Sequence, residues 1–313
     1  MASYKPKTEG AKNKYSTACL LTKDRPNIEH NLNDKYSPAI VFPVGENRKG
    51  EGGLRTQGYF KHDLLKKPLV TIVTAVYNGE KHLEETIQSV INQTYENVEY
   101  IIIDGGSTDG TLDIIKRYDG VINYWISECD RGISDAFNKA VTVSMGSYIN
   151  FQGDGDGFYD KHAIENIMRD IDSSRDMLVS AKIIRIDENG NELFISKQPD
   201  SFSKRSLLFK MPLPHQGLFT NQRLFKKYGL FDINNKYCMD YEHLLRAYND
   251  FPKVILKNII VSKWRYDGLG HNKEMDIFRE YDAIKRHHKV SYDFVLLLIN
   301  YWTVLKFKLK NII

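Results

Sequence analysis

Residues 69–93 read LVTIVTAVYNGEKHLEETIQSVINQ, and the spacing of their apolar residues changes part-way along. The first eight residues are apolar or β-branched without alternation, which is typical of a strand buried on both faces of a sheet. After Gly79 the apolar residues recur every three or four positions, as on one face of a helix. The segment therefore predicts a strand over 69–76 followed by a helix over 79–93.

The same succession of strand and helix continues to about residue 152. VEYIIID and INYWISE are apolar runs of strand length, and STDGTLDIIKRY begins with residues that commonly cap a helix. Alternating strands and helices at this spacing predict βαβ units, and hence an α/β fold with a mostly parallel sheet flanked by helices. The further strands are expected over 98–104, 122–128 and 146–152, and the further helices over 107–118 and 132–144.

Polar or glycine-rich segments follow all four predicted strands. In a parallel sheet the carboxyl ends of the strands meet at one edge, and ligands bind there. A single polar loop would be unremarkable, but four that converge on one edge predict a site. The segments are Tyr77–Glu80, Asp104–Asp109, Glu128–Gly132 and Gly153–Gly157.

The last of these segments places Asp154 and Asp156 one residue apart among glycines. The two carboxylates could cap a following helix, but Asp160 is better placed for that role. They could begin a calcium loop, but the glutamate expected at the twelfth position of such a loop is missing. They could also hold a divalent metal that neutralises a diphosphate, which glycine allows to approach the backbone. We favour this third interpretation, with Asp156 on a surface loop.

Four motifs in this order resemble those of the GT-A family 2 glycosyltransferases. They are VTIVTAVYNGEKHLEETIQSVINQT, EYIIIDGGSTDGT, SECDRGISDAFNKA and GSYINFQGDGDGFYD, and the resemblance runs from about Pro68 to His271. It implies a GT-A domain over 66–275, between an N-terminal extension over 1–65 and a helical tail over 276–313. We expect roughly the first 35 residues to be flexible and VGENRKGEGGLRTQG (44–58) to be a loop.

The resemblance also implies roles for individual residues. Many relatives have adjacent acids where this chain has Gly155 between Asp154 and Asp156. The implied metal, Mn²⁺ or Mg²⁺, would be held by Asp156, Asp154 and His271. The implied nucleotide-sugar-binding residues are Thr74, Val76, Tyr77, Asp104, Arg131, Asp135 and Asp154.

The second half of the chain is less regular. MLVSAKIIRIDENGNELFI predicts two strands joined by a turn at Asn189-Gly190. His215, next to Gln216, is equally well interpreted as a core histidine or as a site residue. Asp240 and Glu242 begin a predicted helix, where acids are also favourable caps. The resemblance implies that Asp240 is the catalytic base, with Glu242 as the second candidate.

The resemblance implies inverting transfer of a sugar from a nucleotide sugar, most simply a UDP-sugar, to an acceptor hydroxyl. The expected setting is O-antigen, capsule or other surface polysaccharide assembly, with a glycan or lipid-linked acceptor. A sugar nucleotidyltransferase and a non-catalytic nucleotide-sugar-binding module remain as alternatives. The sequence contains neither GxxxxGK[ST] nor a GxGxxG that follows a strand, which argues against ATP-driven or dinucleotide chemistry.

Charge and the two ends of the chain bear on partners and location. The 44 basic and 40 acidic residues give a net charge of +4, which does not favour nucleic acid as a partner. No signal peptide is evident, and three separated cysteines suit a reduced cytoplasm. The tail over 293–313 is apolar with a basic end, so it is expected either to lie on the inner face of the cytoplasmic membrane or to pack on protein.

Overall fold

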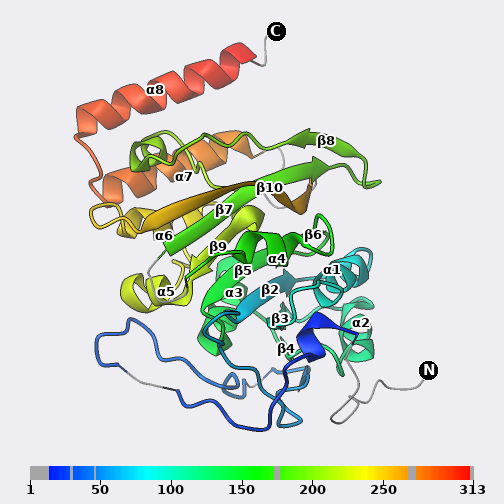
Figure 1. Cartoon of the computed structure of the whole chain (residues 1–313). Helices are drawn as coiled ribbons and strands as arrows, with labels where there is room; N and C mark the ends of the chain where they lie inside the picture. The colour runs from blue at the N-terminus through cyan, green and yellow to red at the C-terminus, as the bar shows by residue number, and fades with distance from the viewer. Residues whose placement is uncertain (1–13, 29–30, 46, 173–176, 267–272, 311–313) are drawn as a thin grey trace.

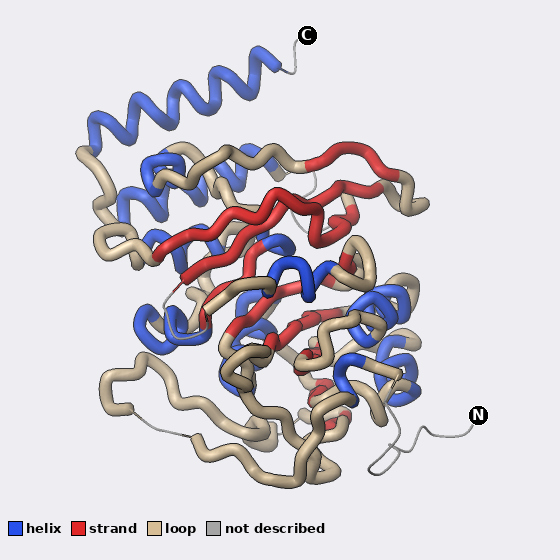
Figure 2. Tube along the Cα trace, in the orientation of Figure 1, coloured by secondary structure: helices blue, strands red, loops and turns tan. Residues whose placement is uncertain are grey.

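In a computed structural model of the chain, one mixed sheet runs through the middle of the molecule and helices cover both of its faces (Figure 1). The structure describes residues 14–28, 31–45, 47–172, 177–266 and 273–310. Within these residues the sheet has ten strands, in the order β1-β4-β3-β2-β5-β9-β7-β10-β6, with β8 paired to β7. The tube in Figure 2 shows the strands side by side in the sheet, with helices on both sides of it.

The first half of the sheet confirms the predicted βαβ units. Its four neighbouring strands β4, β3, β2 and β5 are all parallel. Their side chains are almost wholly buried, which explains the absence of alternation in their sequences. The bounds are β2 Val70–Val76, α1 Leu83–Ile91, β3 Val98–Asp104, α2 Thr111–Arg117, β4 Tyr124–Ser127, α3 Ile133–Val143 and β5 Tyr148–Gly153.

Helices α1 and α2 pack on one face of these strands, and α3 packs on the other. Leu83, Ile87 and Val90 of α1 are fully buried in one core cluster, whereas Phe137 of α3 lies in another. Helix α2 begins later than predicted, at Thr111. Asp109 accepts hydrogen bonds from the backbone and side chain of that residue, and the N-cap position is Gly110, three residues beyond the predicted start.

The second half of the sheet is mixed. The predicted pair of strands around Asn189-Gly190 is the antiparallel hairpin β7–β8, and Gly190 has the positive φ of 84° that its turn requires. Strand β9 runs antiparallel to both β5 and β7 and joins the two halves. The bounds are β6 Gly157–Phe158, α4 Ala163–Met168, β7 Met177–Ile186, β8 Glu192–Ile195, η2 Lys204–Leu208, η3 His215–Gly217, β9 Leu218–Asn221, α5 Gln222–Tyr228, α6 Met239–Arg246 and β10 Lys253–Arg265.

The N-terminal residues that the structure describes are part of the packed domain. The short turn η1 (Ser16–Ala18) is buried, although we expected this region to be flexible. Strand β1 (Gly50–Gly52) pairs with β4, so the expected loop over 44–58 contains a strand. Arg55 is buried and forms an ion pair with Glu99 of β3. Glycine-rich composition concealed these contacts, because the pairing partners lie far away in sequence.

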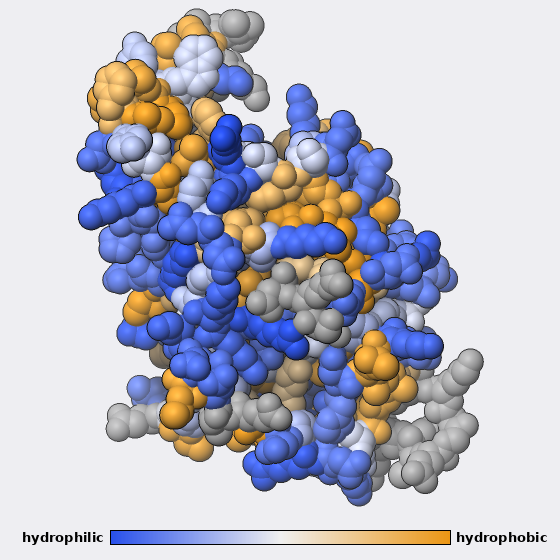
Figure 3. Space-filling view, turned by 60° about the vertical axis from the view of Figure 1, so that its left-hand side comes forward, coloured by the Kyte–Doolittle hydropathy of each residue, from blue (hydrophilic) through white to orange (hydrophobic). Residues whose placement is uncertain are grey.

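The C-terminal helices α7 (Glu274–His287) and α8 (Asp293–Lys310) lie at the top of the molecule in Figure 1. Helix α8 contacts α7 through the rings of Phe278 and Phe307, whose centroids are 5.4 Å apart. Many of its other apolar side chains are exposed, and apolar surface gathers in this upper region in Figure 3. In the described part of the chain, no helix is both long and apolar enough to cross a bilayer.

Candidate active site

Two adjoining pockets open at the carboxyl edge of the parallel strands. The first, the aspartate pocket, has a volume of about 450 Å³ and contains Asp154, Asp156, His215 and Asp240 in its lining. The second, the tyrosine pocket, has a volume of about 570 Å³. It is lined by Val76, Tyr77, Asp130, Arg131, Gly132, Ser134, Asn234 and Asn235, among others. Ile133 and Lys236 line both pockets, so together they form one continuous depression.

Asp156 is held rigidly in the floor of the aspartate pocket. Its Oδ1 accepts a hydrogen bond from the backbone N–H of Arg265 at 3.0 Å. Its Oδ2 accepts from Gln216 Nε2 at 2.9 Å and from the backbone of Gly153 at 3.1 Å. Burial raises its pKa to about 6 in spite of these bonds. The expectation of a surface loop is therefore wrong for Asp156, because the β10 backbone closes over it.

Asp154 has fewer hydrogen-bond partners than Asp156 among the described residues. Its Oδ1 is buried and has no hydrogen-bond partner among the described residues. Burial raises its pKa to about 7, and the nearby charge of Asp156 adds to the effect. The carboxylate lies against Gly79, where an added Cβ would come within 2.3 Å of Asp154 Oδ2. Gly79 therefore leaves the space that Asp154 occupies.

Asp240 and His215 form a pair in the same pocket. His215 Nδ1 lies 3.2 Å from Asp240 Oδ2, while Asp240 Oδ1 accepts a hydrogen bond from the backbone of Tyr241. The imidazole stacks on the rings of Phe137 and Phe151, with centroid distances of 5.6 Å to each. His215 Nε2 is buried without a hydrogen-bond partner in the described part of the molecule. His215 thus combines the two interpretations of its sequence, since it packs in the core and also lines the site.

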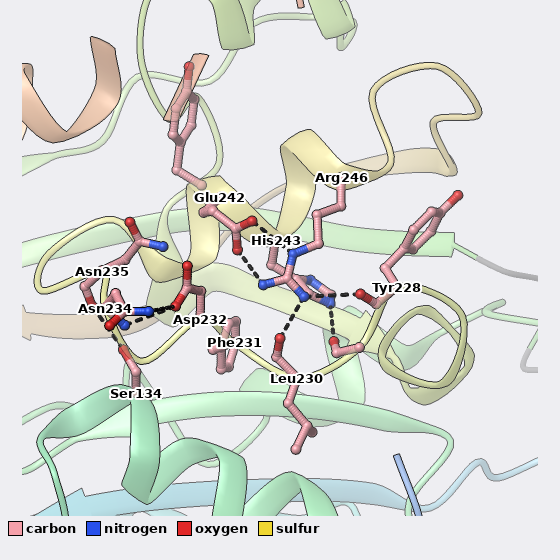
Figure 4. A network of polar contacts seen from close by, with 12 residues as sticks. Ser134, Tyr228, Leu230, Phe231, Asp232, Asn234, Asn235, Glu242, His243 and Arg246 are labelled. Carbon is pink, nitrogen blue, oxygen red and sulfur yellow. Dashed lines mark hydrogen bonds and ion pairs between the residues drawn. The ribbon is translucent and has the colours of Figure 1, made fainter. Parts of the chain in front are cut away.

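Glu242 lies outside the aspartate pocket, in the network of polar contacts shown in Figure 4. It accepts hydrogen bonds from Arg246 at 2.5 and 2.8 Å and lies 2.8 Å from His288 Nε2. Burial alone would raise its pKa, but these two partners outweigh burial and lower it to about 2. Arg246 also donates to the carbonyls of Tyr228 and Leu230. Glu242 lines neither of the two pockets, so it does not lie where a base would meet the acceptor.

The tyrosine pocket gathers several of the residues predicted to bind a nucleotide sugar. Tyr77 is 66% exposed at its rim, so its ring is available to a ligand. Arg131 donates to Asp135 at 3.0 Å, and Asp135 also accepts from the Arg131 backbone at 3.1 Å. Burial acts to raise the pKa of Asp135, but the bonds from Arg131 lower it. Asp135 therefore positions Arg131 and does not itself line the pocket.

Two other predicted residues lie behind the pocket walls. The Thr74 hydroxyl is fully buried and lies 3.1 Å from the Tyr100 hydroxyl. Asp104 is fully buried and accepts from the Ser127 hydroxyl at 2.5 Å and from the Ser107 backbone at 3.2 Å. His271 lies outside the described residues. The structure thus brings Val76, Tyr77 and Arg131 to one pocket and Asp154, Asp156 and Asp240 to the other.

The sequence predicted no role for three residues that shape the two pockets. Gln216 and Arg265 fix Asp156, and Lys236 brings a positive charge to the boundary between the two pockets. Gln216 was visible as the neighbour of His215. Nothing local marks Arg265 or Lys236, because their importance depends on strand register and loop packing.

The family profile described as "Glycosyl transferase family 2" matches residues 71–239, more than half of the chain. The chain belongs to glycosyl transferase family 2. An uncharacterized glycosyltransferase from Rickettsia typhi is 30% identical over 226 residues, which cover 69% of this chain and 70% of that protein. The family match ends one residue before Asp240, so it does not by itself assign that carboxylate.

Solved structures confirm the GT-A fold of this family 2 glycosyltransferase. S. aureus TarS 1-349 in complex with UDP-GlcNAc superposes with a TM-score of 0.58 at 16% identity, covering 75% of this chain and 71% of that one. The mannosyltransferase PcManGT from Pyrobaculum calidifontis, in complex with GDP-Man and Mn²⁺, gives a TM-score of 0.53 at 15% identity, covering 77% and 75%. At these identities the likeness establishes the fold alone.

The fold implies a divalent metal, and the aspartate pocket partly supplies its ligands. No group of three or more His, Cys, Asp or Glu side chains in the described ranges could hold an ion unaided. Asp154 nevertheless has a buried oxygen without a partner, beside a second carboxylate that is already oriented. Such a pair suits a hard cation that takes its remaining ligands from a diphosphate and water, as Mg²⁺ usually does. The residues present therefore fit a metal that binds together with the nucleotide.

Proposed function

We propose that this protein transfers a sugar from a nucleotide sugar, most simply a UDP-sugar, to an acceptor hydroxyl with inversion at the anomeric carbon. The observation that carries the proposal is the aspartate pocket, where the paired acids Asp154 and Asp156 share one cavity with Asp240. The adjoining tyrosine pocket adds an exposed aromatic ring and Arg131. A ring, a cation and paired carboxylates match the base, phosphates and metal of a nucleotide sugar.

The nucleotide would occupy the tyrosine pocket. The exposed Tyr77 ring would lie against the base, and Arg131, held by Asp135, would face the diphosphate. Asp104 and Thr74 would shape the wall behind the nucleotide without contacting it, since both are fully buried. Lys236, at the junction of the pockets, would lie near the diphosphate and add positive charge there.

Asp154 and Asp156 would hold Mn²⁺ or Mg²⁺, with His271 as a further proposed ligand. When bound, such an ion would neutralise charge on the departing nucleoside diphosphate. Asp240 would take the proton of the acceptor hydroxyl while that oxygen bonds to the anomeric carbon. The bond from this carbon to the phosphate oxygen breaks, and its electron pair leaves with the diphosphate. Attack on the face opposite the leaving group inverts the anomeric configuration.

The pair with His215 explains how Asp240 would be aligned for this role. The imidazole packs on the adjacent rings of Phe137 and Phe151, and its Nδ1 lies beside one oxygen of Asp240. Orientation of a reacting group in this way is a large part of enzymatic rate enhancement. His215 is thus a positioning residue in this proposal, and Asp240 is the catalytic base.

For the biological setting, we propose assembly of O-antigen, capsule or another surface polysaccharide, with a glycan or lipid-linked acceptor. The protein would be cytoplasmic and would bind peripherally to the inner face of the membrane through α8. The exposed apolar and aromatic residues of α8 support this location: Phe294, Leu297, Leu298, Tyr301 and Trp302.

Product analysis with a panel of UDP- and GDP-sugars tests the proposed function. Transfer or slow donor hydrolysis should release UDP from a UDP-sugar or GDP from a GDP-sugar, and the anomeric proton of the product should show inversion by NMR. Release of pyrophosphate from UTP and a sugar phosphate would instead identify a nucleotidyltransferase. Nucleotide-sugar binding without turnover of any donor, over a wide range of acceptors, would identify a binding module.

A further inference from the structure

A cluster of aromatic rings around one arginine extends the aspartate pocket outward along the sheet. It consists of Arg185 on β7, Phe194 on β8, Trp264 on β10 and Tyr266 just beyond β10; we call it the Arg185 cluster. Phe194 and Trp264 are the two register partners of Arg185 on the neighbouring strands, so all three side chains lie on one face of the sheet.

This face is the one that lines the aspartate pocket. Ile183 precedes Arg185 by two residues and therefore points to the same side, and it contributes to the pocket wall. Trp264 is itself part of that wall. Trp264 thus belongs both to the wall of the aspartate pocket and to the Arg185 cluster. The surface beside Asp240 and Asp154 therefore continues directly onto the cluster.

Among the described residues, Arg185 has neither a hydrogen-bond acceptor nor an ion-pair partner. The carbon of its guanidinium lies 3.3 Å from the ring centroid of Tyr266, 4.6 Å from that of Trp264 and 5.4 Å from that of Phe194. Its Nε is buried without a hydrogen-bond partner. Within the described ranges Arg185 forms no ion pair, so aromatic stacking, together with attraction from the more distant Glu274, compensates for the partial loss of hydration.

A sugar supplies what this cluster lacks. One face of a pyranose ring is apolar C–H surface that packs on an aromatic ring, while its hydroxyl oxygens accept hydrogen bonds from guanidinium N–H groups. Phe194 is 53% exposed and Tyr266 is 37% exposed, so their rings are accessible from solvent. No carboxylate forms an ion pair with Arg185 in the described structure, although Glu274 attracts its charge from further away.

We propose that the Arg185 cluster binds a sugar ring of the acceptor, so that the acceptor of this transferase is a saccharide held beside Asp240. This inference rests on the proposed function for the direction of transfer. The stacking itself is a binding property and can be measured without turnover. The position of the cluster, at the outer end of the aspartate pocket, leaves the tyrosine pocket to the nucleotide.

Saturation-transfer NMR tests the binding directly. The probes are methyl glycosides of glucose, galactose, mannose and N-acetylglucosamine at millimolar concentration, with UDP and Mg²⁺ present. At least one glycoside should receive saturation on its ring C–H protons from the wild-type protein. Phe194→Ala should weaken that glycoside's affinity about 3- to 10-fold, the range expected for loss of one aromatic contact. Phe194→Tyr, which keeps the ring, should retain the affinity.

Matched variants separate this role from a structural one. Phe209→Ala removes a ring of similar exposure, at 46%, that lines neither pocket, and it should leave glycoside binding unchanged. Arg185→Met should weaken binding, whereas Arg205→Met, an exposed arginine elsewhere, should not. UDP affinity by calorimetry should be equal in all variants.

Three outcomes would overturn the proposal. They are equal glycoside binding by Phe194→Ala and wild type, no saturation transfer to any glycoside from the wild-type protein, and Arg185-dependent binding of inorganic phosphate alone. The last result would identify an anion site. If UDP-sugars are not turned over but a glycoside binds as expected, the proposed function fails and the sugar site stands. If a donor is turned over but Phe194→Ala leaves the acceptor KM unchanged, the proposed function stands and the sugar site fails.

Discussion

His215 Nδ1 lies 3.2 Å from Asp240 Oδ2, although the two residues come from separate elements, η3 and α6. The imidazole packs against the neighbouring rings of Phe137 and Phe151, so this contact restrains Asp240 more than an exposed surface partner would. Asp240 is in the first turn of α6, where a carboxylate is also favoured by the helix dipole. Position alone therefore does not distinguish a base from a cap, but the effect of an amide substitution does.

Asp240→Asn should lower kcat by about 10²–10⁴-fold, the usual contribution of general-base catalysis. Donor affinity, measured by calorimetry, should stay within about twofold of wild type, because donor binding does not require the base. Asparagine caps helices about as well as aspartate, so a capping residue would give nearly normal turnover. Asp250→Asn, at an exposed carboxylate outside both pockets, is the matched control and should not change kcat.

Glu242→Gln should affect stability and not catalysis. The Glu242 pKa is about 2 in the folded protein, below its ordinary 4.5, so the charged form stabilises the fold above pH 4.5. That contribution is lost as the pH falls from 4.5 toward 2. Urea unfolding should show the variant about 2–3 kcal/mol less stable at pH 7, with a smaller difference from wild type at pH 3. A difference that does not depend on pH would contradict the assigned network.

The sequence predicted the parallel half of the fold well, because each of its elements has a local signal. The buried strand over 69–76 and the helical spacing after Gly79 need no knowledge of distant residues. Local sequence signals did not predict a residue's role where that role depends on partners far away in the sequence. Glu242 and Asp240 look equivalent in sequence, yet Arg246 and His288 bind the first and His215 contacts the second.

Burial was the other property that the sequence concealed. The glycines around Asp156 suggested an exposed loop, but β10 follows about a hundred residues later and its backbone closes over the carboxylate. Strand β1 was missed for a similar reason, since Gly50–Gly52 has no strand pattern and is ordered by β4. Three-residue strands of this kind are determined by tertiary context and not by intrinsic preference.

The Arg55–Glu99 pair tests whether the N-terminal residues belong to the domain. Its nitrogen and oxygen lie 2.5 Å apart, and Glu99 also accepts from Thr71 and Met145. Arg55→Met should cost about 3–5 kcal/mol of unfolding free energy, because it leaves a buried carboxylate without its cation. Lys67→Met, which breaks the exposed pair with Glu96, should cost less than about 1 kcal/mol. Similar losses in both variants would argue against a packed N-terminal segment.

Membrane binding by α8 can be tested without removing the helix. Leu298 and Trp302 are 52% and 59% exposed, so replacing both with serine should leave the fold intact. The double variant should bind vesicles of phosphatidylcholine and phosphatidylglycerol about tenfold more weakly in flotation assays, because apolar area no longer enters the interface. The matched control replaces Leu32 and Leu65, which are also exposed. Equal flotation of the variant and wild type, together with a wild-type dimer in sedimentation, would assign the surface to self-association.

Asp154 and Asp156 should differ in their effects on stability, although both are proposed metal ligands. Asp156 accepts three hydrogen bonds, so Asp156→Asn should lower the free energy of unfolding by about 1–3 kcal/mol. Asp154 has a buried oxygen without a partner and faces the charge of Asp156. Asp154→Asn relieves that repulsion and should leave stability unchanged or raise it.

Both variants should lose metal-dependent UDP binding in calorimetry and should lose transfer. EDTA should have the same effect on the wild-type protein, with recovery on addition of Mn²⁺ or Mg²⁺. Undiminished UDP affinity and activity in the chelated enzyme would show that Arg131 and Lys236 neutralise the diphosphate without a metal.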